Sequence, residues 1–326
     1  MRPLVIGLAA LLAAPAAAED RPVLTIYTYD SFVTDWGPGP MIEPRFEEIC
    51  GCDLQLVAAG DGAALLSRLR LEGARTDADI VLGLDTSLTA DGADLVLPHG
   101  LSPAVEVPVE WSDPNFVPYD WGAFAFVYDT TKVEAAPTSF EELMASDLSI
   151  VIQDPRSSTP GLGLLMWVKH VYGDDAAEAW ARLAPRIVTV TAGWSEAYGL
   201  FLEGEADMVL SYTTSPTYHL IAEEDDSKAA AVFEEGHYLQ IEVAGIVKET
   251  DQPELARAFL EFMVTEGFQA AIPTTNWMFP AVTPAAGLPE GFAEPLDPAD
   301  ARLFAPEEAQ ALRETALDEW LAALSR

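Results

Sequence analysis

Short apolar runs and amphipathic stretches alternate along most of the chain. The apolar runs, rich in β-branched and aromatic residues as strands are, lie at residues 22–29, 53–59, 78–85, 116–129, 148–155, 186–191, 207–216 and 237–250. The stretches with apolar residues at helical spacing lie at residues 41–50, 60–73, 156–173, 193–206, 252–265 and 306–325. Strands that alternate with helices in this way predict an α/β fold with parallel strands.

Details of the same pattern predict where single elements begin and what they bury. Asp61 precedes an apolar helical face as a candidate N-cap, and Gly73 follows that face as a stop signal. In the last helix the predicted buried stripe is Leu317, Trp320, Leu321 and Leu324. No repeat or flexible linker divides the chain. Without its apolar N-terminal segment the chain has about 300 residues, a length that suits two domains.

The first 18 residues have the pattern of a cleaved secretory signal. One Arg precedes an apolar run that ends in Ala16-Ala17-Ala18, a small-residue cleavage site. A membrane anchor would need about 20 apolar residues, and this run is too short. We therefore expect residues 1–18 to be removed and the mature protein to be soluble in a bacterial periplasm.

The net charge of −36 argues against nucleic acid and anionic lipid as partners. A well-solvated surface is the simplest explanation of this excess, although a negative field would also help to gather a cationic ligand. The only cysteines, Cys50 and Cys52, have no His nearby and make a poor zinc site. In an oxidising compartment a local disulfide is the expected role, ahead of a redox role.

Enzyme motifs are absent or incomplete. "GWSEA" at residues 193–197 resembles a nucleophile elbow but has Ala197 where the second Gly belongs. The four histidines have no metal-ligand spacing, and there is no phosphate-binding loop of the G-x-x-x-x-G-K type. We therefore expect neither a catalytic site nor a metal site, although a triad assembled from distant residues would leave no local motif.

Two segments join the end of a predicted strand to the start of a predicted helix. They are "GDG" at residues 60–62, and "RSSTPG", in which Ser158 and Thr159 precede Pro160. Ligands of open α/β sheets bind outside the carboxyl ends of the strands, and helix N-termini there offer free N–H groups to an anion such as phosphate. On local sequence alone, ordinary helix capping is the simpler explanation.

Aromatic residues stand beside hydroxyl groups and prolines at four such strand ends. These residues are Tyr29 and Trp36, then Trp194, then Tyr212 and Tyr218, and finally Trp277. A single aromatic residue is more often part of a core, as we expect for Tyr27, but four clusters favour a cage for a flat cation. Asp61 or Asp85 would supply a carboxylate for the same ligand.

At these motifs the sequence closely resembles the periplasmic thiamine-binding proteins of ABC importers. The matching segments are "LTIYTYDSFVTDWGPGP", "ADIVLGLD", "DPRSSTPGLGLL", "VTAGWSEAYGLFLEGEADMVLSYTTSPTYH", "EGHYLQIEVA" and "AIPTTNWMFP". They cover nearly all of the mature chain in order, and the match thins only over residues 220–232 and after residue 280.

The resemblance implies a type II-like binding protein of two α/β lobes, joined by crossing strands, with the ligand in the cleft between them. Residues 19–120 with 243–326 would form lobe 1, and residues 121–242 would form lobe 2. The implied ligand is thiamine, with its monophosphate and diphosphate also accepted. The implied ligand-binding residues are Tyr29, Trp36, Asp61, Gly62, Ser158, Thr159, Trp194, Tyr212, Thr213, Thr214, Ser215, Pro216, Tyr218 and Trp277.

The resemblance also implies a role and its partners. A monomer without cofactor or catalytic activity would deliver thiamine to a membrane permease and, through it, to an ATPase. Another small cation or ferric iron is the alternative ligand within this class. A secreted hydrolase that degrades a thiamine-like compound is the alternative from another class. Such a hydrolase needs a cysteine nucleophile in the cleft, and Cys50 and Cys52 lie away from the strand ends that form it.

Overall fold

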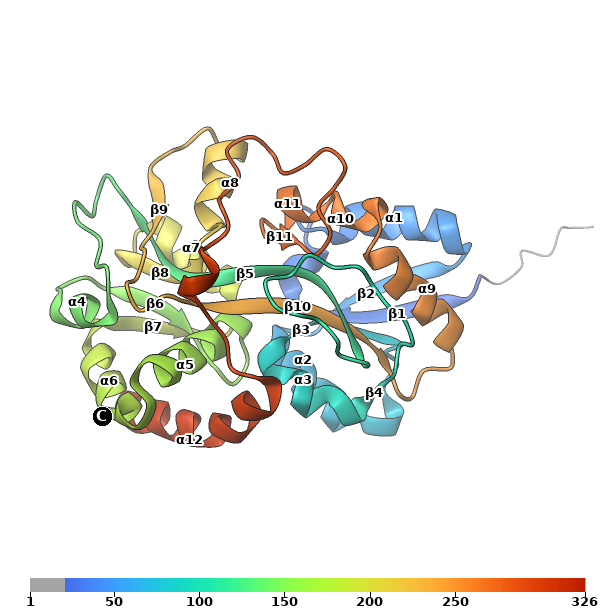
Figure 1. Cartoon of the computed structure of the whole chain (residues 1–326), viewed down its shortest axis with the longest axis horizontal. Helices are drawn as coiled ribbons and strands as arrows, with labels where there is room; N and C mark the ends of the chain where they lie inside the picture. The colour runs from blue at the N-terminus through green and yellow to red at the C-terminus, as the bar shows by residue number, and fades with distance from the viewer. Residues whose placement is uncertain (1–20, 326) are drawn as a thin grey trace, which may run out of the picture.

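One continuous path of hydrogen-bonded strands runs through the molecule in the computed structural model, which describes residues 21–325 (Figure 1). Along this path the strand order is β2-β1-β3-β10-β5-β8-β6-β7. The predicted signal peptide, residues 1–18, lies outside the described residues. Between residues 21 and 325, no helix has the length and apolar character that crossing a membrane requires.

The observed elements follow the predicted alternation of strands and helices. The strands are β1 (Val23–Thr28), β2 (Asp53–Ala58), β3 (Ile80–Asp85), β4 (Val96–Leu97), β5 (Phe116–Asp129), β6 (Ile150–Gln153), β7 (Ile187–Thr191), β8 (Met208–Tyr212), β9 (Lys228–Ala230), β10 (His237–Val247), β11 (Phe279–Pro280) and β12 (Ala301–Arg302). The α-helices are α1 (Gly39–Cys50), α2 (Gly62–Glu72), α3 (Thr86–Gly92), α4 (Phe140–Ala145), α5 (Thr159–Tyr172), α6 (Ala176–Leu183), α7 (Trp194–Glu203), α8 (Ser215–Ala222), α9 (Pro253–Met263), α10 (Glu266–Gln269), α11 (Ile272–Thr275) and α12 (Pro306–Leu324). Short 3-10 helices are η1 (Asp30–Val33), η2 (Gly73–Arg75), η3 (Ala93–Leu95), η4 (Gly173–Asp175), η5 (Ala184–Arg186) and η6 (Pro298–Asp300).

Strands β1, β2 and β3 form a parallel sheet with β1 between the other two. Helices α1 and α9 lie on one side of these strands in Figure 1, and α2 and α3 lie on the other. All six residues of β3 are buried, as expected for a parallel strand covered on both faces. We call these strands and helices lobe 1. A disulfide joins Cys50, the last residue of α1, to Cys52, directly before β2.

Strand β6 pairs in parallel with β7 on one side and β8 on the other. Helices α5 and α6 lie on one side of these strands and α7 and α8 on the other (Figure 1). The side chains of Trp167 and Trp180, on α5 and α6, are fully buried in the core. We call these strands and helices lobe 2, so each lobe is a small α/β unit with its own helical cover.

Two long antiparallel strands join the lobes. Strand β10 pairs with β3 of lobe 1 and with β5, which in turn pairs with β8 of lobe 2. Along β5 the partner changes from β10 at residues 116–123 to β8 at residues 124–128. The predicted two-lobe fold with crossing strands is therefore confirmed.

The C-terminal helix α12 packs against α5 and α6 of lobe 2 and against α3 of lobe 1. Its most buried residues are Ala309, Ala316, Trp320 and Ala323. The leucines of the predicted stripe, Leu317, Leu321 and Leu324, are only half-buried, so the prediction is correct for Trp320 alone.

Candidate functional site

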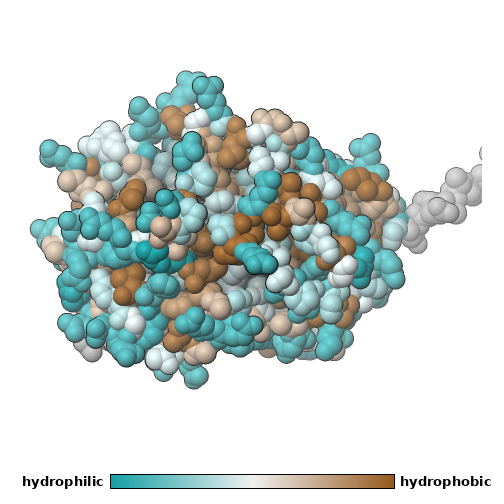
Figure 2. All heavy atoms as spheres, viewed as in Figure 1, coloured by the Kyte–Doolittle hydropathy of each residue, from teal (hydrophilic) through white to brown (hydrophobic). Residues whose placement is uncertain are grey.

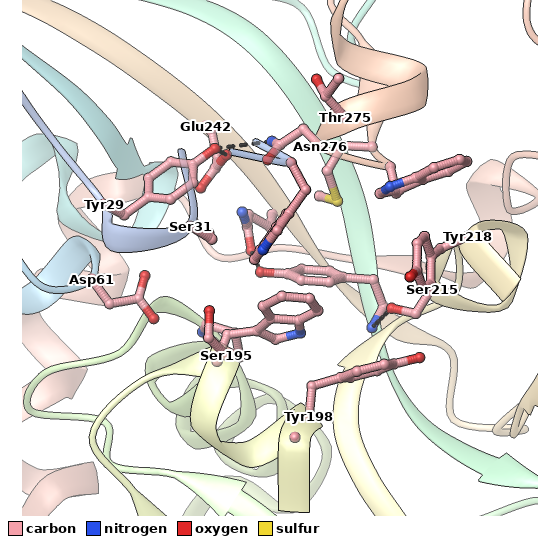
Figure 3. A pocket seen from close by; sticks show the side chains of 18 of the residues that line it. Tyr29, Ser31, Asp61, Ser195, Tyr198, Ser215, Tyr218, Glu242, Thr275 and Asn276 are labelled. Carbon is pink, nitrogen blue, oxygen red and sulfur yellow. Dashed lines mark hydrogen bonds between the residues drawn. The ribbon is translucent and has the colours of Figure 1, made fainter. Parts of the chain in front are cut away.

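A cavity of about 490 Å³ lies between the lobes, next to the crossing strand β10. Lobe 1, lobe 2 and β10 all contribute side chains, as Figure 3 shows. The lining residues are Tyr29, Ser31, Trp36, Asp61, Pro160, Trp194, Ser195, Tyr198, Gly199, Leu202, Tyr212, Ser215, Tyr218, Ala222, Gln240, Glu242, Thr274, Thr275, Asn276, Trp277 and Met278. The lining therefore joins residues that are up to about 250 positions apart in the sequence.

Most of the residues that the sequence predicts for a ligand site line this cavity. They are Tyr29, Trp36, Asp61, Trp194, Tyr212, Ser215, Tyr218 and Trp277. The others, which do not line it, are Gly62, Ser158, Thr159, Thr213, Thr214 and Pro216. Of these, Thr214 is buried and its Oγ1 lies 3.8 Å from the sulfur of Met278, a residue of the lining.

Aromatic rings form much of the wall. Trp194, at the start of α7, stacks on Tyr198 one turn later, with ring centroids 5.0 Å apart. Trp36 of lobe 1 reaches across to Trp194, with 6.4 Å between ring centroids. Tyr218 on α8 meets Trp277 edge to face at 5.4 Å. These rings offer flat faces and edges to an aromatic ligand from both lobes.

The backbone of Trp277 has an unusual conformation. Its φ angle is 56°, in the left-handed region that side chains other than glycine rarely adopt. The backbone N–H of Trp277 donates to the carbonyl oxygen of Ile272 at 3.0 Å, which holds the turn after α11. Such strain is common at binding sites, and here it directs an indole ring into the cavity wall.

Direct hydrogen bonds join the lobes beside the cavity. Ser158 Oγ donates to Asp61 Oδ2 at 2.7 Å, and the Gly62 N–H donates to Thr159 Oγ1 at 3.2 Å. Burial raises the pKa of Asp61, and its hydrogen bonds with Ser158, Gly62 and Thr159 counteract part of that rise. The N-termini of α2 and α5, both candidates for anion binding by sequence, thus meet each other across the cleft.

A buried polar cluster lies where the cavity reaches the crossing strands. Tyr119 and Tyr29 donate from their hydroxyl groups to Glu242 Oε2, at 2.9 and 3.1 Å. Asn276 Nδ2 donates to the Tyr29 hydroxyl at 2.9 Å (Figure 3). It also donates to Asp120 Oδ2 at 2.6 Å. Sequence reasoning missed Glu242 and Asn276 as lining residues. The signal for Glu242 was an acidic residue in the middle of an apolar strand.

One cluster of metal-ligating side chains was found in the described part of the chain, namely His219, Glu223 and Asp225. Both ring nitrogens of His219 already have partners, the Tyr198 hydroxyl at 2.9 Å and Glu223 Oε2 at 2.6 Å. Lys228 Nζ lies 3.2 Å from Asp225 Oδ2, so this carboxylate already has an ammonium group as its positive partner. We therefore interpret these three side chains as a structural cluster that holds helix α8 in place.

Asp85, the second carboxylate that the sequence offers to a ligand, is fully buried and does not line the cavity. Burial raises its pKa to about 7, and the effects of Ser87 and Arg313 reduce that rise. Neither carboxylate oxygen accepts a hydrogen bond of good geometry, so the Ser87 contact offsets burial only in part. Ionised Asp85 is therefore a source of instability.

Replacing Asp85 with asparagine is expected to stabilise the protein more at pH 8 than at pH 4. The folded-state pKa lies above the unfolded value of about 3.9, so the cost is absent below pH 4 and complete above pH 7. A shift of about three units corresponds to at most roughly 4 kcal/mol. Urea denaturation at both pH values measures the difference, with the exposed Asp147→Asn as control. An equal effect at pH 4 and pH 8 would contradict the prediction.

The hydrophilic surface agrees with the acidic composition. Figure 2 shows that hydrophilic residues cover much of the visible face. Two α/β lobes, joined by crossing strands and enclosing a cavity, define the molecule as a binding protein of type II topology.

Comparison with known proteins places the chain in a family. Residues 39–270 match the family described as bacterial extracellular solute-binding protein. The chain is 53% identical over 321 residues to the thiamine-binding periplasmic protein of Escherichia coli K12, covering 97% of this chain and 98% of that one. It is 50% identical to the protein of the same name from Brucella abortus, covering 99% and 98%. The chain belongs to the bacterial extracellular solute-binding proteins, and these relatives within the family are thiamine-binding periplasmic proteins.

A solved structure agrees with this assignment. The structure titled periplasmic thiamin binding protein has a TM-score of 0.91 and 52% sequence identity to this chain. The match covers 96% of this chain and all of that one. An iron-bound protein of Pseudomonas aeruginosa shares the fold, with a TM-score of 0.75, but at 19% identity the likeness shows the fold alone.

Proposed function

We propose that this protein captures thiamine outside the inner membrane and delivers it to the permease of an ABC importer. The observation that carries the proposal is a cavity with aromatic walls from both lobes and a buried carboxylate, Glu242, in its lining. Thiamine joins a flat pyrimidine to a thiazolium ring with a permanent positive charge, and such a ligand suits π faces and carboxylates. Relatives at about half identity carry thiamine binding in their names.

The aromatic residues would hold the rings. In this proposal Tyr29, Trp36, Tyr218 and Trp277 supply stacking faces, and Trp194 lines the cleft. Tyr212, Thr213, Thr214, Ser215 and Pro216 form the adjoining wall, either at the surface of the cavity or behind it. An iron site of the kind implied by more distant relatives would need a set of metal ligands instead.

The hydroxyethyl end of thiamine, or its phosphates, would lie near the two helix N-termini. Asp61 and Gly62 from lobe 1 and Ser158 and Thr159 from lobe 2 meet beside the cavity. Opening the cleft would free their N–H and hydroxyl groups for a phosphate. We propose that thiamine monophosphate and diphosphate are accepted there as well.

The two lobes would close on the ligand by a hinge motion. We propose that residues 19–120 with 243–326 move as lobe 1 and residues 121–242 as lobe 2, with the hinge in β5 and β10. Helix α12, which falls within the range proposed for lobe 1, packs against α3 of lobe 1 and against α5 and α6 of lobe 2. Closure would then bring Trp36 and Trp194 together over the ligand.

The proposal extends to location and partners. Residues 1–18 would direct export, and the mature chain would act in the periplasm as a monomer without cofactor or metal. Its partners would be the permease and, through it, the ATPase, with nucleic acid excluded by charge. A thiamine-degrading hydrolase is not favoured, because Cys50 and Cys52 form a disulfide and neither lines the cavity.

Titration with thiamine is expected to quench the tryptophan fluorescence in a saturable way at submicromolar ligand. Trp36, Trp194 and Trp277 all line the cavity, so a stacked ligand changes their surroundings directly. Chromatography after overnight incubation should recover thiamine intact, as expected for a receptor. No response up to millimolar thiamine would overturn the proposed function, and cleavage of the ligand would favour the hydrolase.

A further inference from the structure

Two carboxyl groups lie next to each other where the crossing strands meet the cavity. Asp120 on β5 and Glu242 on β10 are opposed residues in the antiparallel pairing. Both side chains are buried. Glu242 lines the cavity, and Asp120 lies behind it. A ligand in the cavity would therefore contact Glu242 directly and would affect Asp120 only through Glu242.

The hydrogen bonds around the pair reach two of its four oxygens and leave a buried oxygen of Asp120 free to carry or accept a proton. Glu242 Oε2 accepts from Tyr119 and Tyr29, and Asp120 Oδ2 accepts from Asn276. Asp120 Oδ1 is buried without a hydrogen-bond partner, and Glu242 is the residue opposite Asp120 in the strand pairing. A hydrogen bond between two carboxyl groups requires a proton on one of them.

The surroundings of the pair add negative charge and no compensating cation. Asp61, at the start of α2, also acts on Glu242, and Asp85 on β3 is opposed to Glu242 in the strand pairing. From β8, Tyr212 hydrogen-bonds Gln240 at 2.5 Å and is uncharged. Across the described residues 21–325, no Lys, Arg or His lines the cavity. Arg313 acts on Asp85 from α12 and is not part of the lining.

Burial and mutual repulsion favour the protonated form of the pair. Burial, followed by the charge of Asp120, raises the pKa of Glu242 well above its usual range. Burial also raises the pKa of Asp120 to about 7. Two carboxylates in contact do not both ionise easily, and a cation close to them reverses this preference.

Building on the proposed function, we propose that thiamine binding exchanges a cation for a proton at the Asp120–Glu242 pair. The ligand-free pair holds one proton. When the thiazolium cation enters, the pair releases that proton to solvent, and the fixed charge of the ligand neutralises the second carboxylate. No covalent bond of the ligand changes. The pair thus selects a permanently charged ligand over a neutral one of similar shape, because only the charged ligand can replace the proton.

Isothermal titration calorimetry of the mature protein with thiamine tests this directly. At a fixed pH between 6 and 7, the observed enthalpy in phosphate and in Tris differs by the protons released times the difference in buffer ionisation enthalpy. We expect release of about one proton per thiamine, and an affinity that rises up to about tenfold per pH unit until pH exceeds the pKa of the pair. Binding with no buffer dependence and no pH dependence would overturn the exchange while leaving the proposed function intact. No binding at any pH would instead contradict the proposed function.

Variants separate the exchange from a merely structural role of the pair. Asp120→Asn removes the repulsion between the two carboxylates, so the pKa of Glu242 should fall, proton release should decrease, and thiamine should bind at pH 6 at least as tightly as to wild type. Glu242→Gln should lose both proton release and much of the preference for thiamine over its neutral pyrimidine half. Glu141→Gln, in an exposed ion pair with Arg182, is the matched control and should release protons as wild type does. Unchanged proton release in Asp120→Asn would contradict the proposal. If either variant fails to fold, the wild-type buffer series still decides.

Discussion

Replacing Gly62 with alanine is expected to weaken thiamine binding roughly 10- to 100-fold while both lobes stay folded. A Cβ atom on Gly62 would overlap Thr159 Oγ1 of the other lobe and would lie 3.0 Å from the Gly83 carbonyl oxygen. Overpacking of this kind costs about 1–3 kcal/mol, and here most of the cost falls on the closed state because Thr159 belongs to lobe 2. Fluorescence titration gives the affinity, and small-angle scattering with thiamine should show a less compact particle than wild type.

A second substitution in the opposite lobe is the control for this prediction. In the double variant Gly62→Ala/Thr159→Ala the overlapping hydroxyl is removed, so closure and part of the thiamine affinity should return. The melting temperature of the single variant should stay close to that of wild type. Wild-type affinity in Gly62→Ala would show that the lobes do not need to meet at this point for thiamine to bind.

Replacing Trp277 with alanine is expected to weaken thiamine binding at least about tenfold. The indole forms a wall of the cavity, meets Tyr218 edge to face, and is held by a left-handed backbone that most side chains avoid. Aromatic residues that fill the centre of a binding site often contribute about 2 kcal/mol or more. Tryptophan fluorescence from the remaining indoles, or calorimetry, measures the loss.

Two further variants control for the loss of an aromatic ring in general. Trp277→Phe keeps a smaller ring and should lose less affinity than the alanine variant. Trp121→Phe changes an indole that stacks on Phe279 at 4.5 Å and does not line the cavity, so thiamine affinity should not change. Full affinity in Trp277→Ala would remove the aromatic-cage part of the proposed function.

Much of the fold could be predicted because its elements carry their signals locally. The unbroken apolar run of β3 is buried along its length, and Asp61 and Gly73 begin and end α2 as their residue types suggest. Tyr27 and Tyr29 also show that the position of a residue relative to the strand end predicts whether its side chain packs in the core or lines the cavity. Tyr27 packs in the core, and Tyr29, just past the strand end, lines the cavity.

The polar cluster beside the cavity could not be predicted, because its partners meet only in the folded chain. Glu242 lies in a strand that is buried at every position, and the hydroxyl groups that stabilise its carboxylate come from Tyr29 and Tyr119. Asn276 completes the cluster from a third region of the sequence. Sequence spacing carries no information about such long-range contacts, and an isolated acid in an apolar strand was the only local sign.

The contact between Ser158 and Asp61 was hidden for a related reason. Each residue is a helix cap in sequence, and caps are common. Only the relative position of the lobes brings the two caps within hydrogen-bond distance. The left-handed backbone of Trp277 has no sequence signal at all, since glycine and asparagine are the residues that usually indicate it.

In the proposed hinge motion, helix α12 would have to slide against the lobes. It is fixed to lobe 1 by the ion pair of Arg313 with Asp91 at 2.7 Å, and to lobe 2 by that of Lys169 with Glu319, also at 2.7 Å. The proposed bending of β5 and β10 would change the distance between these two anchors. Three of the most buried residues of α12 are alanines, whose short side chains would suit a shear displacement, and Trp320 is the large buried side chain of the helix. The stiffness of the proposed hinge would therefore depend on two strands at the cleft and on one helix that does not line the cavity.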